Sequence, residues 1–282
     1  MKKIKLNLIL EKINFDSPNF ETDKELLKEY EFYVDANSDF LDDLYTETIQ
    51  EKGDWINMDY TDSLELCYVD LNLTFHSLEL SEDNVTTLNN TVNVIEQFIK
   101  IKEVKEVNNN IDRFNLYEEI FSNDGIVISI SQEGGTLDLY KNDIESFFKE
   151  SNIEYKEISR NLSLVDQGAS SGVDTILYFI VNTMSSGITY DFIKFGISKT
   201  CKGFMDYTIS KKIENLKFKE LRKTIEERCR VDSKNLVLKE MNKNNNEIYF
   251  VFIENNSEIH IITNQNYEII NLNYEIKNEL TK

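Results

Sequence analysis

Residues 64–75 read Leu-Glu-Leu-Cys-Tyr-Val-Asp-Leu-Asn-Leu-Thr-Phe, and this stretch is the clearest long β-strand of the chain. Apolar side chains alternate along it, which is the period-2 pattern of a strand. The alternation changes phase near Tyr68 and Val69, which predicts a β-bulge or a switch of the buried face at that point. Residues 4–10 alternate in the same way and predict a second strand.

Helices and further strands follow along the chain. Ser81 precedes an apolar stripe at spacings of three and four residues, which is typical of an N-cap and an amphipathic helix. Residues 23–33 fit either a short helix or a strand. Asparagine-rich turns separate short apolar segments over residues 235–276 and predict an antiparallel β-meander. We therefore expect an α+β fold of mixed or antiparallel sheets with packed helices.

The chain divides best at residues 107–110, Val-Asn-Asn-Asn. We expect an acidic, aromatic-rich α+β domain at 1–110 and a second α+β domain at 111–282 that ends in the antiparallel strands. Residues 172–197 are unusually apolar and predict a pair of helices, broken near 185–187. As the centre of a globular core this pair would be buried, and its apolar surface also allows for a homo-oligomer.

The charge of the protein is strongly negative and is concentrated in one third of the chain. The 282 residues include 51 Asp and Glu against 31 Lys and Arg, a net charge of −20. Residues 14–98 contain 21 acidic residues and three lysines, which account for −18 of that charge. A field of this sign repels nucleic acid and anionic lipid, so we expect neither a direct nucleic-acid binder nor a membrane anchor.

The acidic third is interleaved with aromatic residues, the types that most often dominate binding at protein interfaces. A clustered negative potential costs stability by self-repulsion but speeds association with a basic partner. The alternative is an acidic face that only keeps the protein soluble. The predicted partner-binding residues are Asp35, Asp39, Asp42, Asp43, Tyr45, Asp54, Trp55, Asp59, Tyr60 and Asp62.

Several common kinds of site are absent from the sequence. No glycine-rich nucleotide fingerprint occurs, and the two histidines, His76 and His260, have no further ligand at metal-binding spacing. We therefore predict no cofactor and no metal. The three cysteines form no Cys-x-x-Cys pair, and residues 1–12 fit a strand better than a signal peptide, so we expect a cytoplasmic protein.

The most enzyme-like stretch is Gly-Ala-Ser-Ser-Gly at residues 168–172. It follows an apolar strand and precedes the predicted helix, which is the context of the nucleophile elbow of serine hydrolases. Ser170 would be the nucleophile, His260 the base, and Asp206 or Asp232 the residue that orients the base. The alternative is structural: these small residues would form the start of a helix and let it pack closely against a neighbouring element.

Three functions therefore follow from the sequence. The first is a non-enzymatic inhibitor that binds and blocks a basic protein, for example one that handles nucleic acid, as in bacterial conflict systems such as phage anti-defence or toxin immunity. The second is a serine hydrolase with its nucleophile at Ser170. The third is a defence component that perturbs membranes through residues 172–197, although a span needs about 20 apolar residues.

Overall fold

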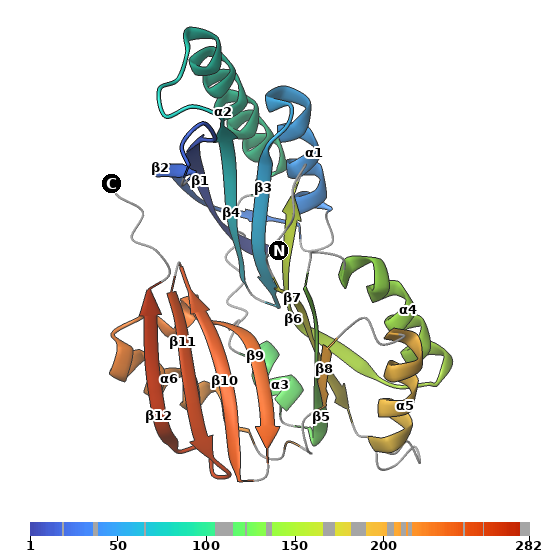
Figure 1. Cartoon of the computed structure of the whole chain (residues 1–282). Coiled ribbons are helices and arrows are strands. Elements are labelled where there is room, and N and C mark those ends of the chain that lie inside the picture. Colours follow the sequence, from blue (N-terminus) through green and yellow to red (C-terminus); the bar gives the residue numbers. More distant parts are fainter. Residues whose placement is uncertain are drawn as a thin grey trace.

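The structure, a computed structural model, describes the chain except for residues 19, 36–38, 65, 105–114, 122, 134–136, 166–172, 182–189, 202–205, 210–212, 214–215, 245, 256 and 277–282 (Figure 1). It confirms the α+β class. An eight-stranded mixed sheet (sheet A) and a four-stranded antiparallel sheet (sheet B) pack with helices.

Two β-hairpins form the first half of sheet A. The elements are β1 (Lys2–Asn14), β2 (Glu21–Val34), α1 (Phe40–Lys52), β3 (Ile56–Ser63), β4 (Leu66–Phe75) and α2 (Glu82–Lys102). The strand order is β2-β1-β4-β3, and the central pair, β1 and β4, is parallel, with Leu6 opposite Val69. Residues 23–33 are therefore strand, and the Ser81 hydroxyl caps α2 by accepting from the amide of Asn84.

The second half of sheet A has a different topology. Its elements are α3 (Asn115–Phe121), β5 (Gly125–Glu133), α4 (Leu137–Glu150), β6 (Tyr155–Val165), β7 (Val173–Val181), α5 (Tyr190–Cys201) and β8 (Asp206–Ile209). The antiparallel order β6-β7-β5-β8, with a helix after β5 and after β7, is the βαββαβ arrangement called split βαβ. Strand β3 pairs with β6, Tyr60 opposite Leu162, so sheet A is continuous across residues 1–110 and 111–282.

Sheet B is the predicted meander. It consists of β9 (Val237–Asn244), β10 (Glu247–Glu254), β11 (Ser257–Asn264) and β12 (Ile269–Ile276), and it follows α6 (Phe218–Cys229) and a 3-10 turn, η1 (Ser233–Asn235). Figure 1 shows it beside the β5–β8 part of sheet A, with α3 between β9 and β5.

Two apolar cores lie on opposite faces of sheet A. Alternate residues of β5 show the division, because Ile128 and Ile130 belong to the core that includes residues of α1, α2, α4 and α5, whereas Val127 belongs to the core that includes residues of α3, α6 and sheet B. The predicted bulge in residues 64–75 is wrong, since the register of β4 is regular against both neighbours. Leu66 and Tyr68 instead contact Val237 and Ile253 of sheet B, so the start of β4 is covered on both faces.

The predicted helical pair at 172–197 is wrong in its first half. Residues 173–181 form β7, a strand in which Ile176 to Ile180 have no solvent exposure. A strand covered on both faces is apolar without alternation, so its pattern resembles that of a buried helix. Residues 182–189 lie outside the described part, and α5 supplies the second half. Among the described residues, no helix is long and apolar enough to cross a membrane.

Strands β5 and β7 pack closely at Gly125, where there is no room for a side chain. A Cβ atom built on Gly125 would lie 2.6 Å from the carbonyl oxygen of Ile180 and 2.2 Å from the ring of Phe179. Because backbone atoms cannot move aside cheaply, we expect Gly125→Ala to lower the free energy of unfolding by about 1–3 kcal/mol in urea denaturation. Glu247→Ala, at the exposed first residue of β10, is the control. A Gly125→Ala protein as stable as the wild type would contradict this packing.

Candidate functional site

Helix α1 presents an acidic outer face. Its exposed carboxylates are Asp39, Asp42, Glu47 and Glu51. Asp43 forms an ion pair of 2.7 Å with Lys102 of α2, whereas Glu47 and Glu51 have no ion pair with any described residue. Asp43, Glu47 and Glu51 follow one another at i,i+4 spacing, where like charges destabilise a helix by about 0.2–0.5 kcal/mol per pair. The helix therefore carries a charge pattern that its own stability does not require.

The other predicted partner-binding residues do not all share this face. Asp35 is exposed at the end of β2, and Asp54 and Trp55 lie in the turn between α1 and β3. Asp59 is exposed on the face of β3 that points away from the helices. Asp62 pairs with Lys2 at 2.6 Å.

The two predicted tyrosines contribute to the core. Tyr45 packs against the core beneath the helices, and Tyr60 is only 4% exposed. The guanidinium of Arg160 lies 5.8 Å from the centre of the Tyr60 ring. Both rings are therefore part of the fold, and the acidic face consists of carboxylates alone.

Four aromatic rings gather where β1 ends and β3 begins, and only one of them, Trp55, is among the predicted partner-binding residues. The ring centres of Phe15 and Trp55 are 5.5 Å apart, those of Trp55 and His76 are 4.3 Å apart, and those of Phe15 and Phe20 are 5.9 Å apart. We call Phe15, Phe20, Trp55 and His76 the tip cluster. Because β1 and β4 are parallel, their C-terminal ends meet at one end of the sheet and bring the cluster together.

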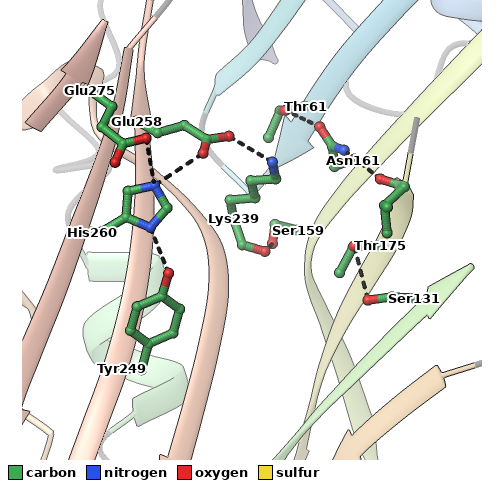
Figure 2. A network of polar contacts seen from close by, with 11 residues as sticks. Thr61, Ser131, Ser159, Asn161, Thr175, Lys239, Tyr249, Glu258, His260 and Glu275 are labelled. Carbon is green, nitrogen blue, oxygen red and sulfur yellow. Dashed lines mark hydrogen bonds and ion pairs between the residues drawn. The ribbon is translucent and has the colours of Figure 1, made fainter. Parts of the chain in front are cut away.

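A polar cleft of about 250 Å³ lies between the two sheets. Its polar lining residues are Lys24, Asp59, Thr61, Asp70, Asn72, Asn161, Asn255, Ser257 and Glu258. Figure 2 shows the two walls, with Thr61 donating to the Asn161 amide oxygen at 2.7 Å on the sheet A side and Glu258 on the sheet B side. This lining can bind a small polar molecule by hydrogen bonds.

Beside the cleft, four side chains of sheet B form a linked acid–base chain (Figure 2). Lys239 lies 2.7 Å from one oxygen of the buried Glu258 carboxylate, and Nε2 of His260 lies 3.2 Å from the other. Nδ1 of His260 is 2.6 Å from the Tyr249 hydroxyl. Burial, reinforced by the nearby carboxylates, raises the pKa of Tyr249. These contacts therefore hold the His260 imidazole at both of its ring nitrogens.

The described residues give no support to the serine hydrolase hypothesis. Ser170 lies outside the described residues, and the segment after it is strand β7 rather than the helix that a nucleophile elbow requires. Asp206 begins β8, and Asp232 caps η1 by accepting from the amide of Lys234. Both nitrogens of His260 are already engaged, and their partners are Tyr249, Glu258 and Glu275.

The comparisons with known proteins return nothing: no protein family, curated protein or solved structure matches this chain. Within the described ranges, no three histidine, cysteine or acidic side chains are grouped to hold a metal ion. Function is therefore inferred from the residues of the chain itself.

Glu240, which interacts electrostatically with His260, makes the stability of the fold depend on pH. Burial raises the pKa of this carboxyl, an effect that Lys239 and His260 oppose. The folded state then binds the proton more tightly than the unfolded chain, so stability falls as the pH rises from about 4 through the folded pKa.

We expect Glu240→Gln to remove that loss, so that the variant gains stability over the wild type at about pH 7 but not at about pH 4. Urea unfolding at the two pH values measures the difference. Glu247→Gln, at an exposed position of β10, controls for the loss of a charge. A difference between Glu240→Gln and wild type that is equal at both pH values would contradict the prediction.

Proposed function

We propose that the protein is a non-enzymatic inhibitor, which binds a basic protein through the acidic face of α1 and blocks its activity. The observation that carries this proposal is the acidic outer face of α1, where Asp39, Glu47 and Glu51 are exposed. These three lie with the half-buried Asp43 in one row at i,i+4 spacing, and Glu47 and Glu51 have no ion pair with any described residue. This arrangement weakens the helix, whereas it would steer a positively charged partner toward it.

The charge also indicates the class of partner. Negative side chains on a regular helix can occupy a groove that otherwise holds nucleic-acid phosphates, so a basic protein that handles nucleic acid fits the proposal best. Inhibitors of this kind act in bacterial conflict systems, as toxin immunity proteins or phage anti-defence proteins. The proposal places the protein in the reducing cytoplasm, in keeping with the free thiols of Cys67 and Cys229.

A charge-neutral α1 tests the proposal. The variant combines Asp39→Asn, Asp42→Asn, Glu47→Gln and Glu51→Gln, and it leaves the helix start intact because the Asp39 side chain makes no capping hydrogen bond. The matched control combines Asp143→Asn, Glu150→Gln, Glu154→Gln and Glu227→Gln, four exposed carboxylates without ion pairs to described residues. Both proteins lose four negative charges.

Each protein serves as bait in lysate of its native cells, at about 0.1 M and about 0.5 M salt, and bound proteins are identified by mass spectrometry. We expect the wild type and the control to retain the same basic protein at low salt and to release it at high salt, and the α1 variant to retain none. Equal retention by the α1 variant, or the absence of any basic protein, would overturn the proposal.

A further inference from the structure

We propose that the tip cluster, Phe15, Phe20, Trp55 and His76, is a binding site for an arginine side chain of the basic partner. This inference rests on the proposed function for the identity of the partner, but its evidence is separate from α1. The cluster lies at the end of β1, β3 and β4 that points away from sheet B (Figure 1).

The rings form a contact group that is open to solvent. Phe15 is 40% exposed and Phe20 is 59% exposed, although both rings contact other aromatic residues. The planes are steeply inclined to one another, with angles of 79° between Phe15 and His76 and 87° between Trp55 and His76. The exposed parts of these rings offer aromatic surface on which a cation can stack.

The backbone is strained where it places these rings. Phe20 has a φ of +47° and Trp55 a φ of +66°, a region that bulky residues rarely occupy. Such a conformation costs on the order of 1–3 kcal/mol at each residue and is concentrated at functional sites. Trp55 is held there by the strand pairing, because its carbonyl oxygen accepts from the amide of Thr74 at 3.0 Å. Two strained aromatic residues in one cluster point to a role in binding.

Three of the four rings are next to an exposed carboxylate in the sequence. Asp16 follows Phe15, Glu21 follows Phe20, and Asp54 precedes Trp55. The three carboxylates are exposed and have no ion pair with any described residue. The surface around the rings is therefore negative, which attracts a cation and repels a second copy of this acidic surface.

A ring at the same end of the sheet already binds a cation within the chain. The Lys52 ammonium lies 4.4 Å from the centre of the Phe75 ring, one residue before His76. Among protein cations, arginine fits the tip cluster best, because its planar guanidinium stacks on aromatic faces and can donate two parallel hydrogen bonds to one carboxylate. Lysine, with a compact and strongly hydrated charge, would gain less from the rings.

Trp55 is the only tryptophan of the chain, so its fluorescence reports directly on the site. The full-length protein is titrated with the blocked peptide acetyl-Gly-Arg-Arg-Gly-amide, and in parallel with the peptides in which both arginines are lysine or glutamate. We expect a saturable change with the arginine peptide, an affinity at least about threefold weaker for the lysine peptide, and no response to the glutamate peptide.

Two variants separate the rings from the charges. Phe15→Leu with Phe20→Leu removes two rings, and Asp16→Asn with Glu21→Gln and Asp54→Asn removes the carboxylates while keeping every ring. We expect each to weaken binding of the arginine peptide about tenfold or more. Phe192→Leu with Phe195→Leu, at exposed positions of α5, is the control and should leave the affinity unchanged.

The inference is overturned if the arginine peptide gives no saturable change, if the lysine peptide binds equally well, or if the Phe15→Leu and Phe20→Leu variant binds as the wild type does. The lysate experiment then distinguishes the two proposals. Loss of the basic partner in the α1 variant but not in the ring variant would leave the proposed function standing and remove the tip cluster. Binding of the arginine peptide at Trp55, without any basic partner in the lysate, would support the tip cluster as an arginine site and overturn the proposed function.

Discussion

The parallel pairing of β1 with β4 is the constraint on which the rest of the structure depends. It joins two hairpins into one half-sheet and places α1 and α2 on the same face, where Leu6 and Val69 meet their core. It also brings the ends of both strands to one edge of the molecule. The turn after β1 therefore lies beside the turn before β3, and the aromatic rings of two distant segments come into contact there.

Because sheet A is continuous, the apolar core under α1, α2, α4 and α5 includes residues from both halves of the sheet. The two faces differ in what covers them. Helices cover one face along most of its length, but sheet B covers the other face mainly at β5 to β7 and at the start of β4. Beyond that cover, the strand residues that point the same way are Asp59, Asp70 and Asn72, whose polar side chains line the cleft. The polar cleft thus follows from where sheet B stops.

Local patterns predicted the elements whose burial is one-sided. The meander and the Ser81-capped helix were found because one face is apolar and the other polar. Strand β7 was missed because both of its faces are buried, and α1 was missed because Thr48 occupies a buried position of its stripe. The positive φ values of Phe20 and Trp55 and the parallel β1–β4 pair depend on contacts between distant segments, so the sequence held no local signal for the tip cluster.

The distribution of ion pairs distinguishes, within the described part of the chain, carboxylates that are paired within the fold from carboxylates that are exposed and unpaired. Three carboxylates on the β1–β2 ladder, Glu11, Asp23 and Glu31, have a lysine partner on the facing strand. The exposed Glu47 and Glu51 of α1 and the carboxylates of the tip cluster have none among the described residues. Solubility alone would be served by charge spread over the whole surface. A net charge of −18 in residues 14–98, with only −2 elsewhere, instead concentrates the negative potential on the part of the chain that carries α1 and the tip cluster, where the proposed binding of a cationic partner would use it.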